Sequence, residues 1–133
     1  MAKNKYDTIL CDLGNVLINF DHRIAVKKIE GRISKKEEEV YQLFFDSDIT
    51  KDYEEGKISS LDFFKKIKEL LGLDMGGSKS ISIGYSNFLP IWNNIFFEEP
   101  INKSMQNFLK GLKGKYKLVI ISNINETHFE YLK

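Results

Sequence analysis

Thr8-Ile9-Leu10-Cys11-Asp12-Leu13-Gly14-Asn15-Val16-Leu17 is an apolar run that reaches one carboxylate and then continues through a glycine and an asparagine. This pattern predicts a buried β-strand that ends at Asp12 and leads into a turn. In an open α/β sheet, ligands bind in the crevice beyond the carboxyl ends of the strands, so Asp12 is well placed for chemistry. The alternative is that Asp12 only caps a turn or a helix.

A second stretch, Lys117-Leu118-Val119-Ile120-Ile121, has the same character and ends at Ser122 and Asn123. Both runs are apolar on consecutive residues, which is typical of parallel strands that helices cover on both faces. If the two strands are neighbours, Asp12 and Ser122 share one crevice. The alternative for Ser122 and Asn123 is that they form the N-cap of a following helix.

The chain between the two strands has helical periodicity. A run of about four helices is expected over residues 20–92, with Ser34 as one N-cap, Ser59 or Ser60 as another, and Gly72 as a stop. Residues 53–59 are expected to form a turn, and residues 78–92 a weaker helix. One further helix is expected from Pro100 to Gly114. A βαβ crossover needs only one helix, so the surplus helices indicate a lid over the crevice.

The order Asp-Leu-Gly-Asn-Val, helical insert, Ile-Ser-Asn resembles the haloacid dehalogenase-like (HAD) hydrolase superfamily, and within it the phosphatases with an Asp-x-Gly-Asn-Val motif that act on sugar phosphates. The resemblance implies an α/β fold, in which an incomplete Rossmann-like core with a parallel sheet carries an inserted all-helical cap. It places the core at residues 1–19 and 93–133 and the cap at residues 20–92.

The resemblance also implies a chemistry. Asp12 would be the nucleophile that forms an aspartyl-phosphate. Mg²⁺ would bind the Asp12 carboxylate and the Gly14 carbonyl, because oxygen ligands suit a hard cation. The Ser122 hydroxyl and backbone N–H groups would hold a small phosphate ester, the N–H groups being those of Leu13, Gly14, Asn15 and Asn123. Asn15 is equally interpretable as a turn residue.

The sequence departs from the usual pattern of the superfamily at Gly14, where most of its phosphatases have a second aspartate as general acid and base. Asp21 and His22 are the nearest titratable substitutes, although Asp21 is interpreted first as a helix cap. The missing acid favours substrates with a good leaving group, such as sugar 1-phosphates. His128 either reaches the rim of the crevice or is a partly exposed helix residue.

Composition narrows the function classes. The 133 residues are 42% hydrophobic and 13% aromatic, which is enough for the core of one domain. The 20 basic and 19 acidic residues are interspersed, so a nucleic-acid partner is not expected. The single cysteine, Cys11, allows no intrachain disulfide and favours a reducing compartment. The sequence shows no signal peptide or membrane span, so we expect a cytoplasmic protein without membrane partners.

The third and fourth motifs of the superfamily have no counterpart before Lys133. We therefore expect the remainder of the hydrolase core to follow Lys133, and this part alone to be nearly inactive. Two other functions stay open. One is hydrolytic dehalogenation, which would need Arg23 or Arg32 in a halide pocket, and the other is a phosphate-binding module without turnover. Tyr53, Phe45 and Trp92 either line the pocket of the cap or pack inside it.

Overall fold

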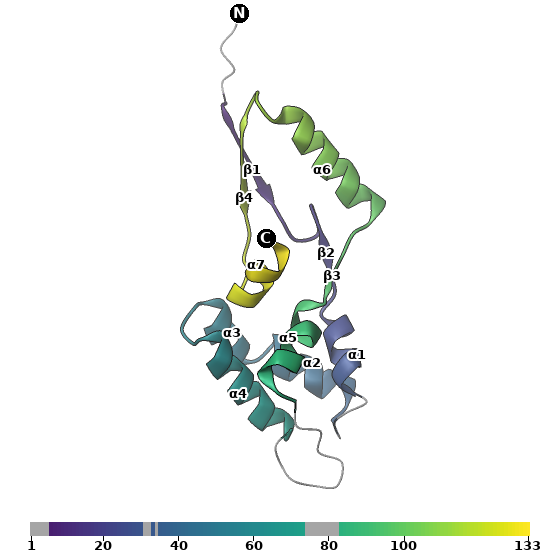
Figure 1. Cartoon of the computed structure of the whole chain (residues 1–133), viewed down its shortest axis with the longest axis vertical. Coiled ribbons are helices and arrows are strands. Elements are labelled where there is room, and N and C mark those ends of the chain that lie inside the picture. Colours follow the sequence, from purple (N-terminus) through teal and green to yellow (C-terminus); the bar gives the residue numbers. More distant parts are fainter. Residues whose placement is uncertain (1–5, 31–32, 34, 74–82) are drawn as a thin grey trace, which may run out of the picture. The chain divides into compact units, whose positions relative to one another are not determined.

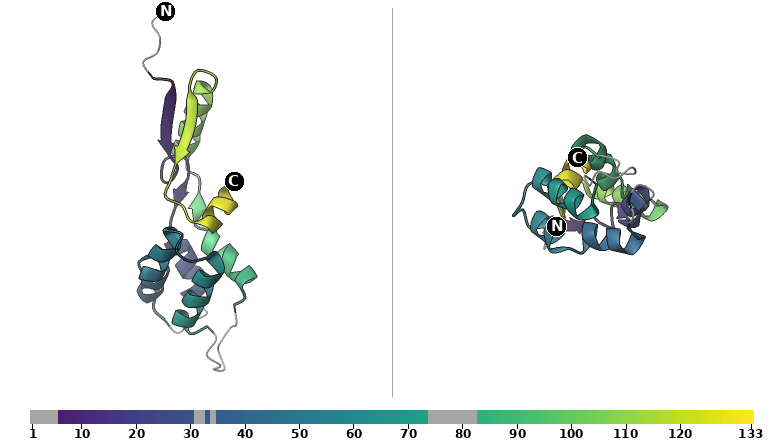
Figure 2. Two further views of the ribbon diagram at one scale, coloured as in Figure 1. Left: turned by 90° about the vertical axis from the view of Figure 1, so that its left-hand side faces the viewer. Right: turned by 90° about the horizontal axis from the view of Figure 1, so that it is seen from below.

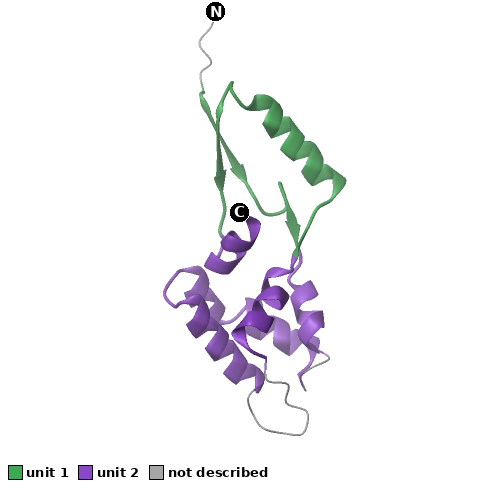
Figure 3. Cartoon of the chain, in the orientation of Figure 1, with its two compact units in different colours: residues 1–20, 96–123 green, residues 21–95, 124–133 purple. Residues whose placement is uncertain are grey.

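The computed structural model describes residues 6–30, 33, 35–73 and 83–133. The described part is a mixed α/β structure (Figure 1), which confirms the expected fold class. In chain order its elements are β1 (Thr8–Asp12), β2 (Asn19–Phe20), α1 (Arg23–Glu30), α2 (Glu37–Phe45), α3 (Asp48–Glu54), α4 (Ser60–Leu71), α5 (Tyr85–Asn93), β3 (Phe96–Phe97), α6 (Pro100–Leu112), β4 (Lys117–Ile121) and α7 (Glu126–Leu132). The chain divides into two compact units, residues 1–20 with 96–123 and residues 21–95 with 124–133 (Figure 3).

The first unit contains a parallel pair of strands. β1 and β4 run in the same direction (Figure 2), in a register that pairs Thr8 with Lys117 and Asp12 with Ile121. Because the register ends at Asp12, the residues that follow both strands leave the sheet at the same edge. The expected neighbouring strands are therefore present.

The expectation that both strands are buried is wrong for the described structure. Leu10 is 62% exposed on one face of the pair, and Ile120 is 57% exposed on the other. The consecutive apolar residues indicated covering layers on both faces, as is usual in parallel sheets. Only β1 and β4 pair in this sheet of the described part, and two strands cannot bury each other's faces.

α6 and the segment after β1 are joined by Asn102, which is fully buried. Its Oδ1 accepts a hydrogen bond from the Glu99 N–H over 2.8 Å and so caps the helix. Its Nδ2 donates to the Val16 carbonyl over 3.1 Å and to Asn19 Oδ1 over 2.9 Å. α6 begins at Pro100, as predicted, because its fixed φ suits the first helical position.

The second unit consists of helices whose apolar faces meet around aromatic rings. Trp92, Phe44, Phe63 and Phe88 are all at most 2% exposed. The Trp92 ring lies 5.8 Å from that of Phe44 and 4.8 Å from that of Phe63, measured between ring centroids. Rings of this size contribute large buried apolar areas, and tilted or edge-on pairs add to that stabilisation. Helix α7 belongs to this unit, although it follows β4 directly in the chain (Figure 3).

Several helix ends agree with the sequence. Ser59 caps α4 through a hydrogen bond from the Asp62 N–H, and Gly72 ends the helix with a φ of 68°. A positive φ favours glycine, which has no Cβ to clash with the carbonyl. Helix α2 differs, because it begins at Glu37 with Lys36 as its N-cap. The predicted cap, Ser34, lies outside the described residues.

Helix α3 was not foreseen. Ser47 starts it by accepting a hydrogen bond from the Thr50 N–H over 3.2 Å, so the described part of residues 20–92 contains five helices instead of about four. Tyr53 consequently lies in a helix, and the turn predicted from residue 53 starts only at Glu55. Helix α5 starts at Tyr85, whereas the start predicted at residue 78 lies outside the described residues.

Candidate functional site

Asp12 is the last residue of β1, and its side chain is exposed. Its Oδ1 accepts a hydrogen bond from the Leu13 N–H over 2.7 Å, which fixes the carboxylate at the end of the strand. Ile121 is the partner of Asp12 in the sheet, and Ser122 is the next residue. The acid and the hydroxyl-bearing residue therefore leave the sheet at the same edge, in one compact unit.

The turn after β1 is held by backbone hydrogen bonds. The Leu13 carbonyl accepts from the N–H groups of Leu17 and Ile18, and the Asn15 N–H donates to the Ile18 carbonyl over 2.7 Å. Asn15 has a φ of 57°, so it is a turn residue in the left-handed region. The N–H groups of Leu13 and Asn15 are engaged in hydrogen bonds. Of the three N–H groups that follow Asp12, only that of Gly14 forms no hydrogen bond with a described residue.

Gly14 is required by a close approach of a side chain. A Cβ at this position would lie 2.8 Å from Cε1 of Phe20, which is shorter than any normal carbon contact. Its φ is not positive, so the backbone itself would accept another residue. The Phe20 ring thus occupies the space that a longer side chain at position 14 would need, and an acid there would have to displace it.

Ser122 and Asn123 do not cap the following helix. Helix α7 begins at Glu126 and is capped by Asn125, whose Oδ1 accepts from the His128 N–H over 3.0 Å. The alternative interpretation of Ser122 and Asn123 as an N-cap is therefore wrong. Both residues lie in the connection between β4 and α7, and their role as phosphate ligands stays a prediction.

Asp21 and His22 lie in the second unit, where each contacts neighbouring residues. Asp21 Oδ1 accepts a hydrogen bond from the Arg23 N–H over 2.9 Å, so Asp21 caps α1, as expected. The His22 ring stacks on Phe45, with 4.0 Å between centroids and 6° between planes. Burial lowers the pKa of His22, and the Asp21 carboxylate opposes this shift. A role of either residue as a general acid stays a prediction.

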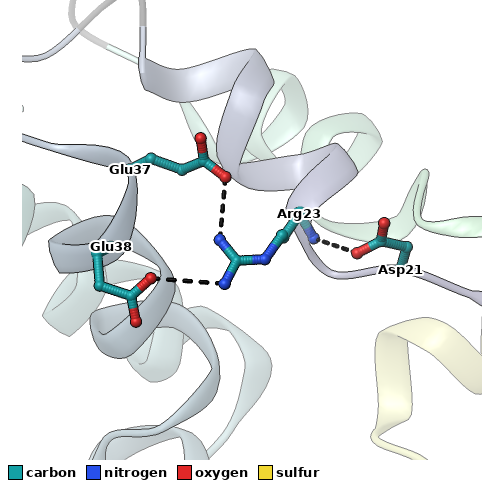
Figure 4. A network of polar contacts seen from close by, with 4 residues as sticks. All are labelled: Asp21, Arg23, Glu37 and Glu38. Atoms are coloured by element: carbon teal, nitrogen blue, oxygen red, sulfur yellow. Dashed lines mark hydrogen bonds and ion pairs between the residues drawn. The ribbon is translucent and has the colours of Figure 1, made fainter.

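Arg23 forms ion pairs with the carboxylates of Glu37 and Glu38, as Figure 4 shows. Its Nη1 lies 3.0 Å from Glu37 Oε1 and its Nη2 lies 3.5 Å from Glu38 Oε2. The guanidinium also lies 4.8 Å from the centroid of the Tyr41 ring. A halide pocket needs an unneutralised arginine, so this arrangement gives no support to a dehalogenase. Arg32, the other arginine considered, lies outside the described residues.

Tyr53, Phe45 and Trp92 pack inside the helical unit. Tyr53 and Trp92 are 4% and 1% exposed, and the Phe45 ring stacks on Trp92 with 5.0 Å between centroids. Of the two roles considered for these side chains, packing is the one that the structure supports.

His128 is buried, and neither interpretation made from the sequence is right. It is 6% exposed and stacks on Trp92 with 5.2 Å between centroids. Asn125 Nδ2 is a donor, so His128 Nδ1 accepts from it over 3.0 Å and His128 Nε2 donates to the Trp92 carbonyl over 3.2 Å. Burial lowers the pKa of His128 to about 4, against the raising effect of the bond to Trp92. The imidazole is therefore neutral at pH 7.

A cluster of hydrogen bonds around Thr127 was missed entirely by the sequence analysis. Thr127 Oγ1 accepts from Tyr53 Oη and from Trp92 Nε1, each over 3.1 Å. It also lies within hydrogen-bond distance of Asn125 Oδ1. The partners are far apart in the sequence and have no common spacing, so no periodicity could have revealed them.

Metal-binding groups are sparse in the part of the chain that the structure describes. Within residues 6–30, 33, 35–73 and 83–133, no three or more His, Cys, Asp or Glu side chains are grouped so that they could hold a metal ion. At the end of β1, the oxygen atoms available for a cation are the Asp12 carboxylate and the Gly14 carbonyl. Neither Asp12 Oδ2 nor that carbonyl accepts a hydrogen bond from a described residue. The donor type suits a hard cation, but more ligands are needed to complete its coordination.

Solved structures with the same fold are HAD family enzymes. The chain is similar to the HAD family enzyme BT-2542 from Bacteroides thetaiotaomicron in its crystal structure with magnesium and inorganic phosphate, at 23% identity and a TM-score of 0.73, over 96% of this chain and 58% of that one. An aspartate-to-alanine mutant of that enzyme, also with magnesium and phosphate, gives a TM-score of 0.74 at 23% identity over the same shares. The magnesium complex is 25% identical, with a TM-score of 0.73 over 97% of this chain and 58% of that one.

The chain thus has the fold of these enzymes and spans 58% of the length of the first of them. No protein-family model and no curated protein sequence matches it. Among the helices that the structure describes, none has the length and apolar character needed to cross a membrane.

Proposed function

We propose that the protein containing this chain hydrolyses a small phosphate monoester with the help of Mg²⁺, and that Asp12 is the nucleophile. The observation that carries the proposal is that Asp12 ends β1 opposite Ile121 of the parallel strand β4, and that Ser122 directly follows Ile121. Solved structures with the same fold, which were obtained with magnesium and inorganic phosphate, support it.

The reaction has two steps. First, a carboxylate oxygen of Asp12 attacks the phosphorus, the ester P–O bond breaks, and the leaving oxygen departs with the bonding electron pair and takes up a proton. Water then attacks the phosphorus of the aspartyl-phosphate, which releases inorganic phosphate and restores the carboxylate. Attack by a carboxylate on a phosphate dianion brings like charges together, and Mg²⁺ supplies the positive charge that offsets this repulsion.

The residues of the first unit have distinct roles in this scheme. Asp12 and the Gly14 carbonyl would be the metal ligands of this part of the chain. The Gly14 N–H and the Ser122 hydroxyl would donate hydrogen bonds to phosphate oxygens, together with the N–H of Asn123. Leu13 and Asn15 would support the turn, because their own N–H groups are already bonded.

The surroundings of Gly14 support a proposal about the substrate class. Phe20 leaves no room for a side chain there, so an acid two residues after the nucleophile is excluded without a change in Phe20. We propose that the leaving group needs little protonation, as in a sugar 1-phosphate. A matched pair of esters tests this, because an aryl alcohol is a better leaving group than an alkyl alcohol. The ratio of the hydrolysis rates of an aryl phosphate and an alkyl phosphate should be larger than in enzymes that carry a general acid.

The experiment that tests the proposed function is a phosphate-release assay on the full-length protein with a panel of phosphate monoesters, with and without Mg²⁺. Asp12→Asn should abolish release because the amide is a poor nucleophile. Asp7→Asn is the matched control, since Asp7 precedes the opposite end of the same strand and is exposed. Equal loss in both variants, or unchanged release in Asp12→Asn, contradicts the proposal.

Trapping distinguishes an enzyme from a phosphate-binding module. Beryllium fluoride should form a stoichiometric adduct with Asp12 in the full-length protein, and Asp12→Asn should form none. We also propose that the 133-residue chain alone turns over very slowly, because it spans only 58% of the similar enzyme. Turnover equal to that of a longer polypeptide contradicts this second proposal.

A further inference from the structure

A cleft of about 390 Å³ lies within the second unit, between helices α4, α5 and α7. All of its lining residues belong to the helical unit, and Asp12 is not among them. Most of its wall is apolar, polar atoms come from hydroxyl, amide and carboxylate side chains, and no lysine, arginine or histidine is among the lining residues. The lining residues are Ser60, Tyr85, Leu89, Asn93, Glu126, Thr127, Glu130 and Tyr131.

Asn93 is the unusual member of this lining. The residue is 9% exposed, and its Oδ1 is a buried acceptor without a hydrogen-bond partner among the described residues. A buried acceptor without a donor is costly, and such groups in native structures are normally satisfied. The terminal torsion of asparagine has a broad energy well, so the amide can turn its oxygen toward a donor in the cleft. Asn93 therefore indicates a ligand that carries hydrogen-bond donors.

Two of the hydroxyl groups that line the cleft are already engaged in hydrogen bonds within the protein. Thr127 Oγ1 already accepts from Tyr53 and Trp92. Ser60 Oγ donates to Glu126 Oε2. The Asn93 oxygen and the second oxygen of the Glu126 carboxylate are therefore two acceptors that a ligand can use.

The charged, aromatic and apolar side chains of the cleft restrict the kind of ligand further. The Lys133 ammonium pairs with Glu130, so the negative charge of the cleft comes from Glu126, for which no ion pair with a described residue is found. Tyr85 and Tyr131 add aromatic rings, whose faces attract cations. Leu89 provides an apolar contact. An inorganic cation is disfavoured, because no described group of acids, histidines or cysteines could coordinate a metal ion.

We propose that this cleft binds a small organic molecule with a primary ammonium group. The ammonium donates to Asn93 Oδ1 and to the Glu126 carboxylate, and its hydrocarbon part lies against Leu89 and the Tyr85 ring. Hydrogen bonds between a charged donor and these acceptors are stronger than neutral ones. Binding requires no chemistry at Asp12, so the inference is independent of the proposed hydrolysis.

The test is an NMR titration of the ¹⁵N-labelled full-length protein with butylammonium chloride at constant ionic strength. The expected result is a saturable shift of the Asn93 side-chain NH₂ signals and of backbone amides in α4, α5 and α7 that line the cleft. Neutral 1-butanol tests for a purely apolar pocket, and MgCl₂ tests for a metal site. Saturable binding of either compound at the same amides with equal or higher affinity overturns the inference, as does the absence of saturable binding of butylammonium.

Variants locate the binding group. Asn93→Leu and Glu126→Gln should each raise the dissociation constant about tenfold or more, because the first removes an acceptor and the second removes the negative charge that strengthens the other hydrogen bond. Asn87→Leu and Glu69→Gln are matched controls on exposed positions of α5 and α4, and they should leave the constant unchanged. If Asn93→Leu fails to fold, the affinity of Glu126→Gln and the pattern of shifted signals in the wild-type protein still test the inference. Wild-type affinity in Glu126→Gln overturns the inference.

Discussion

The indole Nε1 of Trp92 donates a hydrogen bond to Thr127 Oγ1 over 3.1 Å, and so joins helix α5 to helix α7. The same oxygen accepts from Tyr53 of helix α3 over 3.1 Å. One hydroxyl group thus serves donors from two helices. α7 is attached to the helical unit through this oxygen as well as through His128.

Replacing this hydroxyl should destabilise the helical unit. We expect Thr127→Val to lower the free energy of unfolding by about 1–3 kcal/mol, because two donors lose their acceptor while the volume is kept. Thr127→Ser retains the hydroxyl and should lose less. Urea denaturation followed by circular dichroism measures both variants. Equal losses in the two would mean that the methyl group, and not the hydrogen bonds, carries the stabilisation.

The low pKa of His128 predicts a dependence of stability on pH. Its pKa is about 4 in the folded chain and near 6.5 in a model peptide, so between these values the unfolded chain binds more protons. The stabilisation by the neutral ring is complete above about pH 6.5 and is lost progressively as the pH falls toward 4, by at most about 3 kcal/mol.

Two measurements check this expectation. The His128 ring protons should titrate by NMR with a midpoint near pH 4, and denaturation midpoints should decrease through the same range. In His128→Asn, which lacks the titrating ring, the decrease should be smaller. A His128 titration midpoint near 6.5 in the folded chain contradicts the burial argument.

The contact between Gly14 and Phe20 predicts a coupled pair. Gly14→Ala should cost about 1–3 kcal/mol, because its Cβ has no room beside the Phe20 ring. In a Phe20→Leu background the cost should be smaller, and a double-mutant cycle measures the coupling. Gly111→Ala is the control: nothing lies within 4 Å of a Cβ at that helical position, so it should stabilise by about 0.5–1 kcal/mol. Additive effects of the Gly14 and Phe20 changes would rule out the steric explanation.

Asn102 should be the most sensitive polar residue of α6. Asn102→Ala removes the partners of the Glu99 N–H and of the Val16 carbonyl, and we expect a loss of about 2–3 kcal/mol. Asn107→Ala, at an exposed position of the same helix, should change stability by less than about 0.5 kcal/mol. Thermal unfolding of the two variants in parallel measures the difference. Similar melting temperatures would show that the buried amide is not important for stability.

Local rules in the sequence were sufficient for β1 and β4 and for several helix ends. The runs that end at Asp12 and Ile121 were recognisable because β-branched and apolar residues stop at polar ones, and both strands formed in the expected orientation. Ser59, Gly72 and Pro100 ended or started helices where their backbone preferences indicated. Each of these signals depends only on nearby residues.

Features that depend on distant residues escaped prediction. The exposure of Leu10 and Ile120 reflects which layers surround the strands, and composition carries no information about that. His128 looked like a surface residue until Trp92, far away in the sequence, was found stacked on it. The roles of Asp12, Gly14 and Ser122 stay predictions, because they depend on a bound ligand.

Trp92 is the only tryptophan of the chain. Its indole is 1% exposed and stacks on the rings of Phe45 and His128. The tryptophan fluorescence of the chain, which excitation near the red edge of the absorption band selects over that of the tyrosines, therefore originates at a single buried position inside the helical unit. An emission spectrum can therefore detect the unfolding of these helices without any label. A red shift of the emission on dilution into acid shows when water reaches the indole.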